Sequence, residues 1–557
     1  YLQPLFKLDN CMHHRTAMGK FVLVLLLVTN LYCVLTEPVV HVDQGSISGI
    51  TLKSRGGREF SAFLGIPYAQ PPIGELRFRS PVPNGQWNGT LKAHKEGAEC
   101  PQLSGILPLG SEDCLYLNVY VPKQKGQKLL PVMVYIHGGG YLVGSSGREQ
   151  FGPYYLMDKD IVLVTLNYRL GILGFLSTGD DAAPGNFGLK DQQLAMKWAK
   201  QNIRAFGGDS EWITLFGESA GSSSCHLHSL SKESKRYFNN YILQSGVAFC
   251  PWAFHSDRAY YNDAKRFAKL HNCPTADSHK LVNCLRQLPA ALLQDLSIYS
   301  LLQQQLFYTW GPTIEPPSDT AFITESPLKL SQKNEMKMSP LMTGNCRDEG
   351  LLTAKCKHHK STPQIFSIFN FYFLQIITII WSIKFKNFYL GDETRASRDK
   401  VNLLTDFVFF YPQTQYFKFL KDNFTQPVYR YLFNYHGAYS QSIVGTYSNA
   451  NLGISHADDL LYLFRITSRS LGSPFDYKHT PSDIEISKLM VDLWTSFATT
   501  SKPTSNHLTE ASEWQPLHQN LTYLEIGNIS TTQTTVQSKF FEKRMKFLED
   551  IYTWSDT

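Results

Sequence analysis

The chain has 557 residues, of which 43% are hydrophobic, so it is long enough to bury a large core. It carries 53 basic and 47 acidic residues, and its formal net charge is +6, with no block of like charge. So small and scattered an excess indicates neither a nucleic-acid partner nor another polyanionic one.

The amino terminus has the pattern of a secretory signal peptide, because Lys20 precedes the apolar run 21–28 and smaller residues follow before Glu37. The run is shorter than the roughly 20 residues that a spanning helix needs. We therefore expect residues 18–36 to be a cleaved signal peptide, not a membrane anchor, and the protein to be secreted. Residues 1–17 precede Met18 and are predicted to be translated upstream sequence, and residues 37–557 are predicted to form one domain.

Two further features agree with an oxidising, extracellular location. Cys100 with Cys114, and Cys273 with Cys284, each bracket a short loop that a disulfide would close. Four Asn-x-Ser/Thr sequons are candidate glycosylation sites: Asn88, Asn423, Asn520 and Asn528. Four other cysteines have no obvious partner and are interpreted as buried free thiols: Cys225, Cys250, Cys346 and Cys356. No Cys/His spacing indicates zinc, and the sequence does not indicate an oligomeric state.

The first half of the chain alternates predicted strands and helices. Residues 39–70 are rich in β-branched residues broken by Gly and Pro, which predicts a lead-in of antiparallel strands before the parallel part of the sheet. The runs 132–136 and 161–166 are short and continuously apolar, as buried parallel strands are. Residues 191–206 place Leu194, Trp198 and Ile203 on one helical face.

A strand at 212–216 and a helix at 222–230 follow, and 490–498 is the clearest late helix. This alternation predicts an α/β fold built on a doubly wound, mostly parallel sheet.

One segment, 362–390, has a biased composition without Gly, Ala, Val, Asp, Glu or Arg. Its uncharged stretch 365–382 has about the length of a marginal membrane span. A single span there would put His456 across the membrane from Ser219, so we interpret the segment as an anomalous insert of translated non-coding sequence. Sequencing the transcript tests this hypothesis.

The strongest chemical motif is Gly-Glu-Ser-Ala-Gly at 217–221, a G-x-S-x-G turn that would expose the Ser219 hydroxyl between a strand and a helix. A bare match arises by chance, but the predicted strand and helix on either side supply the required context. His-Gly-Gly-Gly at 137–140 follows another predicted strand. It is either a flexible turn or an oxyanion hole formed by the N–H groups of Gly139, Gly140 and Ala220. We expect glycines there because a Cβ would block the substrate.

A serine nucleophile needs a base, and the base follows the acid in the chain order Ser, acid, His. His456 stands out among 17 histidines because its loop leads into an apolar stretch. The residues alone leave other histidines open and do not identify the acid.

With these motifs the chain resembles the type-B carboxylesterases and cholinesterases. The resemblance rests on SEDCLYLNVY, HGGG, NYRLGILGFL, NFGLKDQQLAMKWAKQNIRAFGGD, FGESAG, the DEG of GNCRDEG, and SHADDLLYLF. It implies an α/β-hydrolase fold, a small-molecule ester substrate and no cofactor. It also implies that Ser219 is the nucleophile, Glu349 the acid and His456 the base, with disulfides Cys100–Cys114 and Cys273–Cys284. Glu218 would be an electrostatic residue beside the nucleophile or, equally, a carboxylate with a structural role.

The chain departs from the pattern of two groups within this family, and these differences narrow the kind of esterase that it resembles. Between Cys100 and Ser111 the chain lacks the longer, tryptophan-bearing loop with which cholinesterases hold a quaternary ammonium. Insect juvenile hormone esterases usually carry Gln where Glu218 stands. The chain therefore looks like a general insect-type carboxylesterase. A non-catalytic adhesion protein of the same fold and a slow-turnover ester scavenger are the alternatives.

Overall fold

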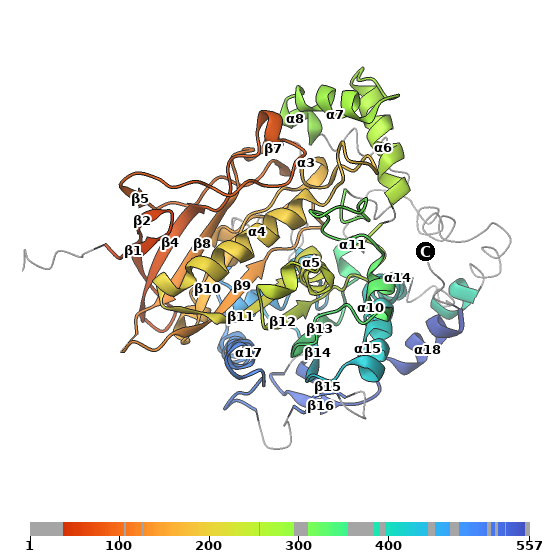
Figure 1. Cartoon of the computed structure of the whole chain (residues 1–557). Coiled ribbons are helices and arrows are strands. Elements are labelled where there is room, and N and C mark those ends of the chain that lie inside the picture. Colours follow the sequence, from red (N-terminus) through yellow and green to blue (C-terminus); the bar gives the residue numbers. More distant parts are fainter. Residues whose placement is uncertain are drawn as a thin grey trace, which may run out of the picture.

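The computed structural model describes residues 37–104, 107–124, 126–255, 257–294, 310–354, 384–389, 396–443, 452–467, 478–508, 514–517, 522–529 and 531–551 (Figure 1). The predicted upstream segment and signal peptide, Cys356 and Asn520 lie outside these residues. So does the insert 362–390, apart from residues 384–389.

The centre of the fold is an 11-stranded sheet with the order β16-β15-β14-β13-β12-β11-β9-β10-β8-β4-β3. Its strands are β3 (Ile50–Lys53), β4 (Glu59–Pro67), β8 (Tyr116–Pro122), β9 (Leu130–Ile136), β10 (Val162–Leu166), β11 (Gly208–Glu218), β12 (Asn240–Gln244), β13 (Leu341–Cys346), β14 (Val428–Tyr435), β15 (Tyr523–Ile529) and β16 (Thr535–Gln537). Two small sheets pair β1 (Val39–Val42), β2 (Gly45–Ser48) and β5 (Thr90–Lys92), and β6 (Gln102–Ser104) with β7 (Leu107–Leu109).

All neighbours from β15 to β10 are parallel, whereas β8, β4 and β3 on one edge and β16 on the other pair antiparallel. The runs 132–136 and 161–166, predicted as buried parallel strands, lie in β9 and β10 and pair in parallel. The antiparallel lead-in is also present, as the pairs β1–β2 and β3–β4. The predicted α/β class with a mostly parallel sheet is confirmed.

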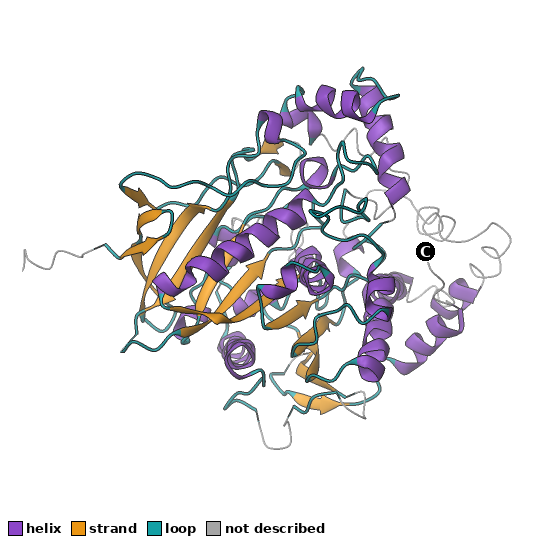
Figure 2. Ribbon diagram, in the orientation of Figure 1, coloured by secondary structure: helices purple, strands orange, loops and turns teal. Residues whose placement is uncertain are grey.

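Helices cover both faces of the sheet (Figure 2). They are α2 (Arg148–Phe151), α3 (Gly171–Phe175), α4 (Phe187–Asn202), α5 (Ala220–Leu230), α6 (Asp257–Leu270), α7 (Ser278–Arg286), α8 (Ala290–Leu293), α10 (Pro327–Gln332), α11 (Leu351–Ala354), α14 (Ala396–Thr405), α15 (Tyr411–Asn423), α16 (Leu460–Leu463), α17 (Pro481–Thr500) and α18 (Glu542–Ile551). Short 3₁₀ turns are η1 (Gly74–Leu76), η2 (Leu156–Asp158), η3 (Ile203–Phe206), η4 (Ser234–Arg236) and η7 (Gln441–Ile443), and η6 (Asp406–Phe410) is a π-helix.

Strand β9 shows how the two faces form separate cores. Side chains alternate along a strand, so Val132, Val134 and Ile136 pack with α4 and α5 in one cluster. Met133 and Tyr135 point the other way and pack with α16 and α17. A strand that is buried on both faces has no polar side, which is why this segment reads as a continuous apolar run.

Two predicted helices differ from the observed ones at their ends. The helix predicted at 191–206 begins four residues earlier, at Phe187, because Asn186 takes a left-handed conformation with φ 55°. It becomes a 3₁₀ turn at Ile203 and stops at Gly207, whose φ is 83°. The helix predicted at 490–498 is the last half of α17, which starts at Pro481 behind a capping box formed by Thr480 and Asp483.

The structure contains the disulfides Cys100–Cys114 and Cys273–Cys284, the two pairings expected from the sequence. Cys225, Cys250 and Cys346 are free and buried. Of the four sequon asparagines, Asn88, Asn423 and Asn528 are described, and all three are exposed.

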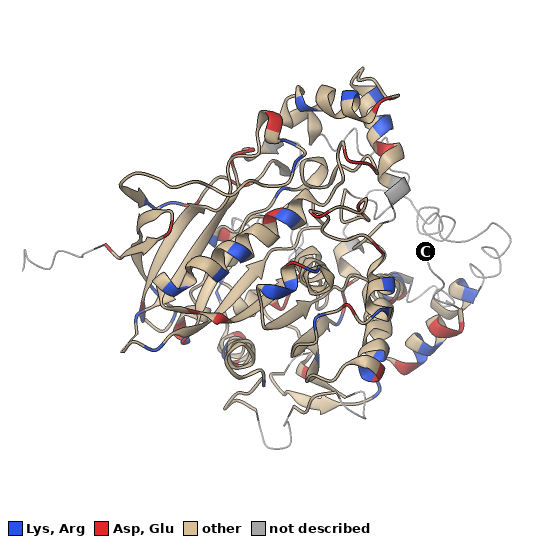
Figure 3. Cartoon of the chain, viewed as in Figure 1, with Lys and Arg blue, Asp and Glu red and all other residues tan. Residues whose placement is uncertain are grey.

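None of the helices within the described ranges is long and apolar enough to cross a membrane. Basic and acidic residues are interspersed along the helices that face the viewer in Figure 3, including α4, α6 and α18.

Candidate functional site

The predicted site residues meet at the carboxyl ends of neighbouring parallel strands. Ser219 follows β11, His137–Gly140 follows β9, Glu349 follows β13, and His456 lies in the loop after β14. This edge is where open α/β sheets bind their ligands. Ser219 is 9% exposed, His456 5% and Glu349 0%.

The turn that carries Ser219 is tight and strained. Ser219 has φ 57° and ψ −121°, a backbone conformation that L-residues rarely adopt, and its N–H donates to Gln244 O at 2.8 Å. The glycines on either side allow β11 and α5 to approach the end of β9. A Cβ on Gly217 would lie 2.7 Å from Ile136 O, and one on Gly221 would lie 2.0 Å from the same oxygen.

We therefore expect Gly221→Ala to destabilise the fold by about 3 kcal/mol, since backbone atoms would have to shift to make room for the methyl group. Urea unfolding measures the change. Gly85→Ala is the matched control, because a Cβ on Gly85 meets nothing within 4 Å. Equal stability of the two variants would contradict the packing described for this turn.

The His-Gly-Gly-Gly turn packs directly against the nucleophile turn. A Cβ on Gly138 would lie 2.6 Å from Glu218 Oε2 and 3.0 Å from the Cβ of Ser219. Ala220, the third predicted oxyanion donor, is the first residue of α5, so its N–H has no partner within the helix.

The structure gives a reason for glycine in this turn that does not involve the substrate. Gly139 and Gly140 have φ of 101° and 62°, and a Cβ on Gly139 would lie 2.1 Å from Val143 O, whereas one on Gly140 would meet nothing within 4 Å. The positive φ therefore favours glycine at both positions, and at Gly139 a Cβ would also conflict with the protein itself. That a Cβ here would block the substrate stays a prediction.

Glu349 and His456, 107 residues apart in the chain, form a buried pair in which His456 Nδ1 lies 2.5 Å from Glu349 Oε2. The other carboxylate oxygen of Glu349 accepts from Cys346 N at 2.9 Å and from Asn345 Nδ2 at 3.1 Å. The two loops are joined through Asp348, whose N–H donates to Ile454 O at 2.9 Å and whose Oδ2 accepts from Ile454 N at 3.0 Å.

The second ring nitrogen of His456 faces Glu218, with Nε2 3.0 Å from Oε1. This is an ion-pair distance, but the two groups are not aligned as a hydrogen bond, and Nε2 makes no hydrogen bond to any described residue, Ser219 included. The imidazole thus lies between two carboxylates.

Burial alone would lower the pKa of His456, but the negative charges of Glu218 and Glu349 outweigh it and raise that pKa well above the usual range. A second histidine behaves in the opposite way. Burial lowers the pKa of His137 to about 4, so this ring is neutral and stacks on Tyr168 with centroids 4.4 Å apart.

Sequence reasoning missed two acidic residues that follow His456. Asp458 accepts hydrogen bonds from Ser440 Oγ, Gln441 N and Ser455 N, which hold the loop, while burial raises its pKa to about 8. Burial, with the nearby charge of Glu218, raises the pKa of Asp459 to about 7. The only available signal was the adjacent pair in SHADDLLYLF, and it is weak, because aspartates are mostly exposed.

An aromatic wall beside the base was also missed. The Phe409 ring lies 4.8 Å from the His456 ring and 5.8 Å from the Trp252 ring, centroid to centroid. Phe409 sits in the π-helix η6, and Trp252 Nε1 donates to Val408 O in the same element at 3.3 Å. Single π-turns of this kind recur at functional sites.

No group of three or more His, Cys, Asp or Glu side chains in the described part of the chain is placed to hold a metal ion. The candidate site contains a hydroxyl, an imidazole and carboxylates beside a turn rich in backbone N–H groups.

Known proteins resemble this chain in sequence and in fold. The model described as "Carboxylesterase family" matches residues 36–548. The juvenile hormone esterase of Tribolium castaneum is 35% identical over 93% of this chain and 94% of the relative, and a carboxylic ester hydrolase of Bombus ignitus is 35% identical over 88% and 90%. The crystal structure of juvenile hormone esterase from Manduca sexta, with OTFP covalently attached, has a TM-score of 0.81 at 28% identity. The match covers 93% of this chain and 100% of that one.

Proposed function

Because the chain belongs to the carboxylesterase family, and is thereby a carboxylic ester hydrolase acting on small-molecule esters, we propose that Ser219, His456 and Glu349 are its catalytic triad. The observation that carries the proposal is the buried contact of 2.5 Å between His456 Nδ1 and Glu349 Oε2, at the same sheet edge as the strained Ser219 turn. An imidazole fixed through Nδ1 has Nε2 available for a proton from a nucleophile.

The reaction would proceed by two acyl transfers. His456 Nε2 takes the Ser219 proton, the serine oxygen attacks the ester carbonyl, and the alcohol leaves with the proton returned by His456. Water repeats the sequence on the acyl-enzyme and releases the acid. The N–H groups of Gly139, Gly140 and Ala220 would bind the oxyanion, and Glu349 would hold the tautomer and stabilise the imidazolium.

The ion pair between Nε2 and Glu218 would be the resting state of the free enzyme. Before catalysis, Nε2 would have to leave this carboxylate for the oxygen of Ser219, the next residue in the chain. Raising the pKa of His456 keeps the ring protonated to higher pH, and a protonated base cannot accept the serine proton. Glu218 would therefore set the pH at which the enzyme becomes active.

We expect Glu218→Gln to shift the acid limb of the kcat/KM profile to lower pH by about 1 to 3 units, the usual effect of one nearby charge. The sign follows because removal of the carboxylate lowers the pKa of His456, and the neutral base then persists to lower pH. Glu485→Gln is the charge-matched control, since Glu485 is exposed on α17. A limb that stays in place in both variants would rule out this role for Glu218.

Hydrolysis of a short-chain aryl acetate tests the proposed function, with an organophosphate inhibitor in a parallel reaction. We expect steady turnover that the organophosphate abolishes, with the adduct mapping by mass spectrometry to the peptide containing Ser219. An adduct on any other residue would contradict the proposal. The covalently attached OTFP in the similar Manduca sexta structure supports a covalent step.

A slow-turnover scavenger is the alternative within the same chemistry. It would release one equivalent of alcohol in a burst and then stop, because water would fail to attack the acyl-enzyme. The same assay, followed at high enzyme concentration, separates the burst from steady turnover.

We also propose that the protein is exported. The signal-like pattern at 18–36, the two disulfides and the exposed asparagines of three sequons support this location. Detection of the glycosylated protein in the medium of expressing cells tests it, and retention of all the protein inside the cells would contradict it.

A further inference from the structure

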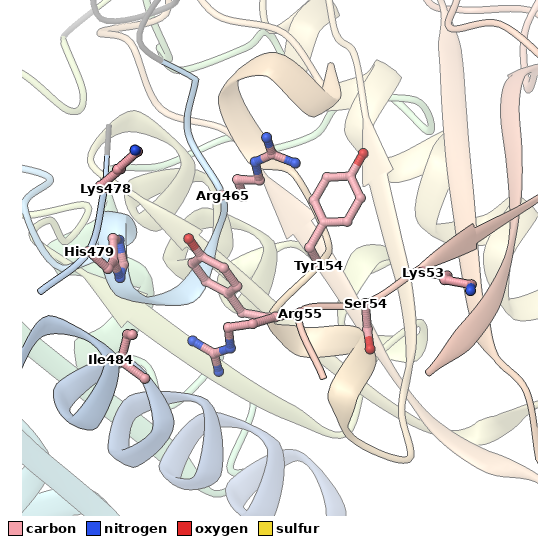
Figure 4. A pocket seen from close by; sticks show the side chains of 9 residues that line it. Lys53, Ser54, Arg55, Tyr154, Arg465, Lys478, His479 and Ile484 are labelled. Atoms are coloured by element: carbon pink, nitrogen blue, oxygen red, sulfur yellow. The ribbon is translucent and has the colours of Figure 1, made fainter. Parts of the chain in front are cut away.

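A cavity of about 510 Å³ lies apart from the catalytic residues, none of which lines it (Figure 4). Four separate segments form it: the end of β3 with the turn after it, the segment between α2 and η2, the single residue Arg465 after α16, and the segment 478–484 that leads into α17. Its volume falls within the range of small-molecule pockets.

The lining is strongly basic. Lys53, Arg55, Arg465 and Lys478 line the cavity, and no carboxylate does. Only Arg55 has an acidic partner among the described residues, Asp158, at 3.5 Å. Three cations around one cavity are therefore left without an ion pair in the part of the chain that the structure describes.

Two of these cations are held in place by the fold. Arg55 Nη1 donates to Ser487 Oγ at 2.7 Å, and its guanidinium lies 4.4 Å from the Tyr155 ring centroid. The Arg465 guanidinium lies 5.3 Å from the ring of Tyr154. Figure 4 shows Arg465 between Tyr154 and Lys478.

Backbone hydrogen bonds fix the segments relative to one another. Gly152 and Arg465 exchange two, at 3.2 and 3.0 Å, and Arg55 N donates to Tyr154 O at 2.9 Å. The guanidinium groups and the two rings are thus presented on a connected frame, so a ligand would not have to order them first.

We propose that this cavity binds a small aromatic molecule that bears a phosphate or sulfate group. A guanidinium presents N–H donors in a planar fork that matches the oxygens of such a group, and the lysines add point charge. The Tyr154 and Tyr155 rings provide a flat apolar surface for the body of the ligand. This site is separate from ester hydrolysis and does not depend on the triad.

Isothermal titration calorimetry with phenyl phosphate tests the proposal on the wild-type protein and on the double variant Arg465→Gln/Lys478→Gln. Both side chains are exposed, so the variant should fold normally. We expect the dissociation constant to rise about tenfold or more, since two charged partners are lost. Lys197→Gln/Arg204→Gln removes the same charges from exposed positions on α4 and η3 and should bind as the wild type does.

Three results would overturn the proposal. Equal affinity for phenyl phosphate in the two double variants would place the ligand elsewhere. Equal affinity for inorganic phosphate and phenyl phosphate would remove the role of the tyrosine rings. Binding to phosphatidic acid vesicles without binding to phenyl phosphate would assign the cavity to a lipid headgroup instead.

Discussion

Ser219→Ala should lower kcat for an aryl acetate by about 10⁵ to 10⁶-fold, the loss expected when the nucleophile of an acyl-transfer triad is removed. Without the hydroxyl no acyl-enzyme can form, and only substrate binding and oxyanion stabilisation remain. The measurement is the rate of aryl alcohol release under saturating substrate, with enzyme concentration fixed by absorbance.

The fold should survive this change, which makes the result interpretable. Alanine keeps the Cβ and leaves the backbone at φ 57° and ψ −121°, and the hydrogen bond from residue 219 N to Gln244 O is independent of the side chain. We expect the melting temperature to stay within about 2 °C of the wild type. An active, folded Ser219→Ala protein would show that another residue attacks the ester. Exposed Ser482→Ala is the control for the substitution itself.

The nucleophile turn could be predicted from the sequence because its requirements are local. A strand, two glycines and a helix that follow one another between Gly208 and Leu230 define it. The close approach of Gly217 and Gly221 to Ile136 explains why both positions lack a side chain. The buried strands could be predicted equally well, since a strand that packs on both faces leaves a continuous apolar run in the sequence.

The acid of the triad, Glu349, could not be predicted from local sequence. Glu349 reaches His456 through a bridge between two loops, in which Asp348 holds Ile454, and no periodicity encodes a contact over 107 residues. Only the resemblance supplied Glu349. The position of Glu218 against Nε2 depends on the orientation of the imidazole ring, so the sequence left its electrostatic and structural roles equally open.

The sequence did not predict the basic cavity, for a different reason. The four cations come from two distant parts of the chain, and each alone looks like a solvated surface residue: Lys53 and Arg55 in one part, and Arg465 and Lys478 in the other. Tertiary packing of α16, α17 and the turn after β3 brings them together. A scattered net charge of +6 thus excludes an extended basic surface but not a local one.

Glu349→Gln should lower kcat by about 10⁴-fold with little change in KM, the loss seen when a triad carboxylate becomes an amide. Glutamine keeps an oxygen that can accept from Cys346 N and Asn345 Nδ2, so the loop should retain its hydrogen bonds. Its NH₂ group, however, faces Nδ1 and favours the tautomer in which Nε2 carries the proton and cannot act as a base. The developing imidazolium also loses its buried counter-charge.

The same experiment separates the two carboxylates that contact His456. If Glu349 is the orienting acid, Glu349→Gln should reduce kcat far more than Glu218→Gln does, because the Nδ1 contact sets the tautomer whereas the Nε2 contact must open before catalysis. Glu349→Asp, which retains the charge, should recover part of the lost rate. A larger loss in Glu218→Gln, with Glu349→Gln nearly active, would exchange the roles of the two residues and make the ion pair at Nε2 the productive contact.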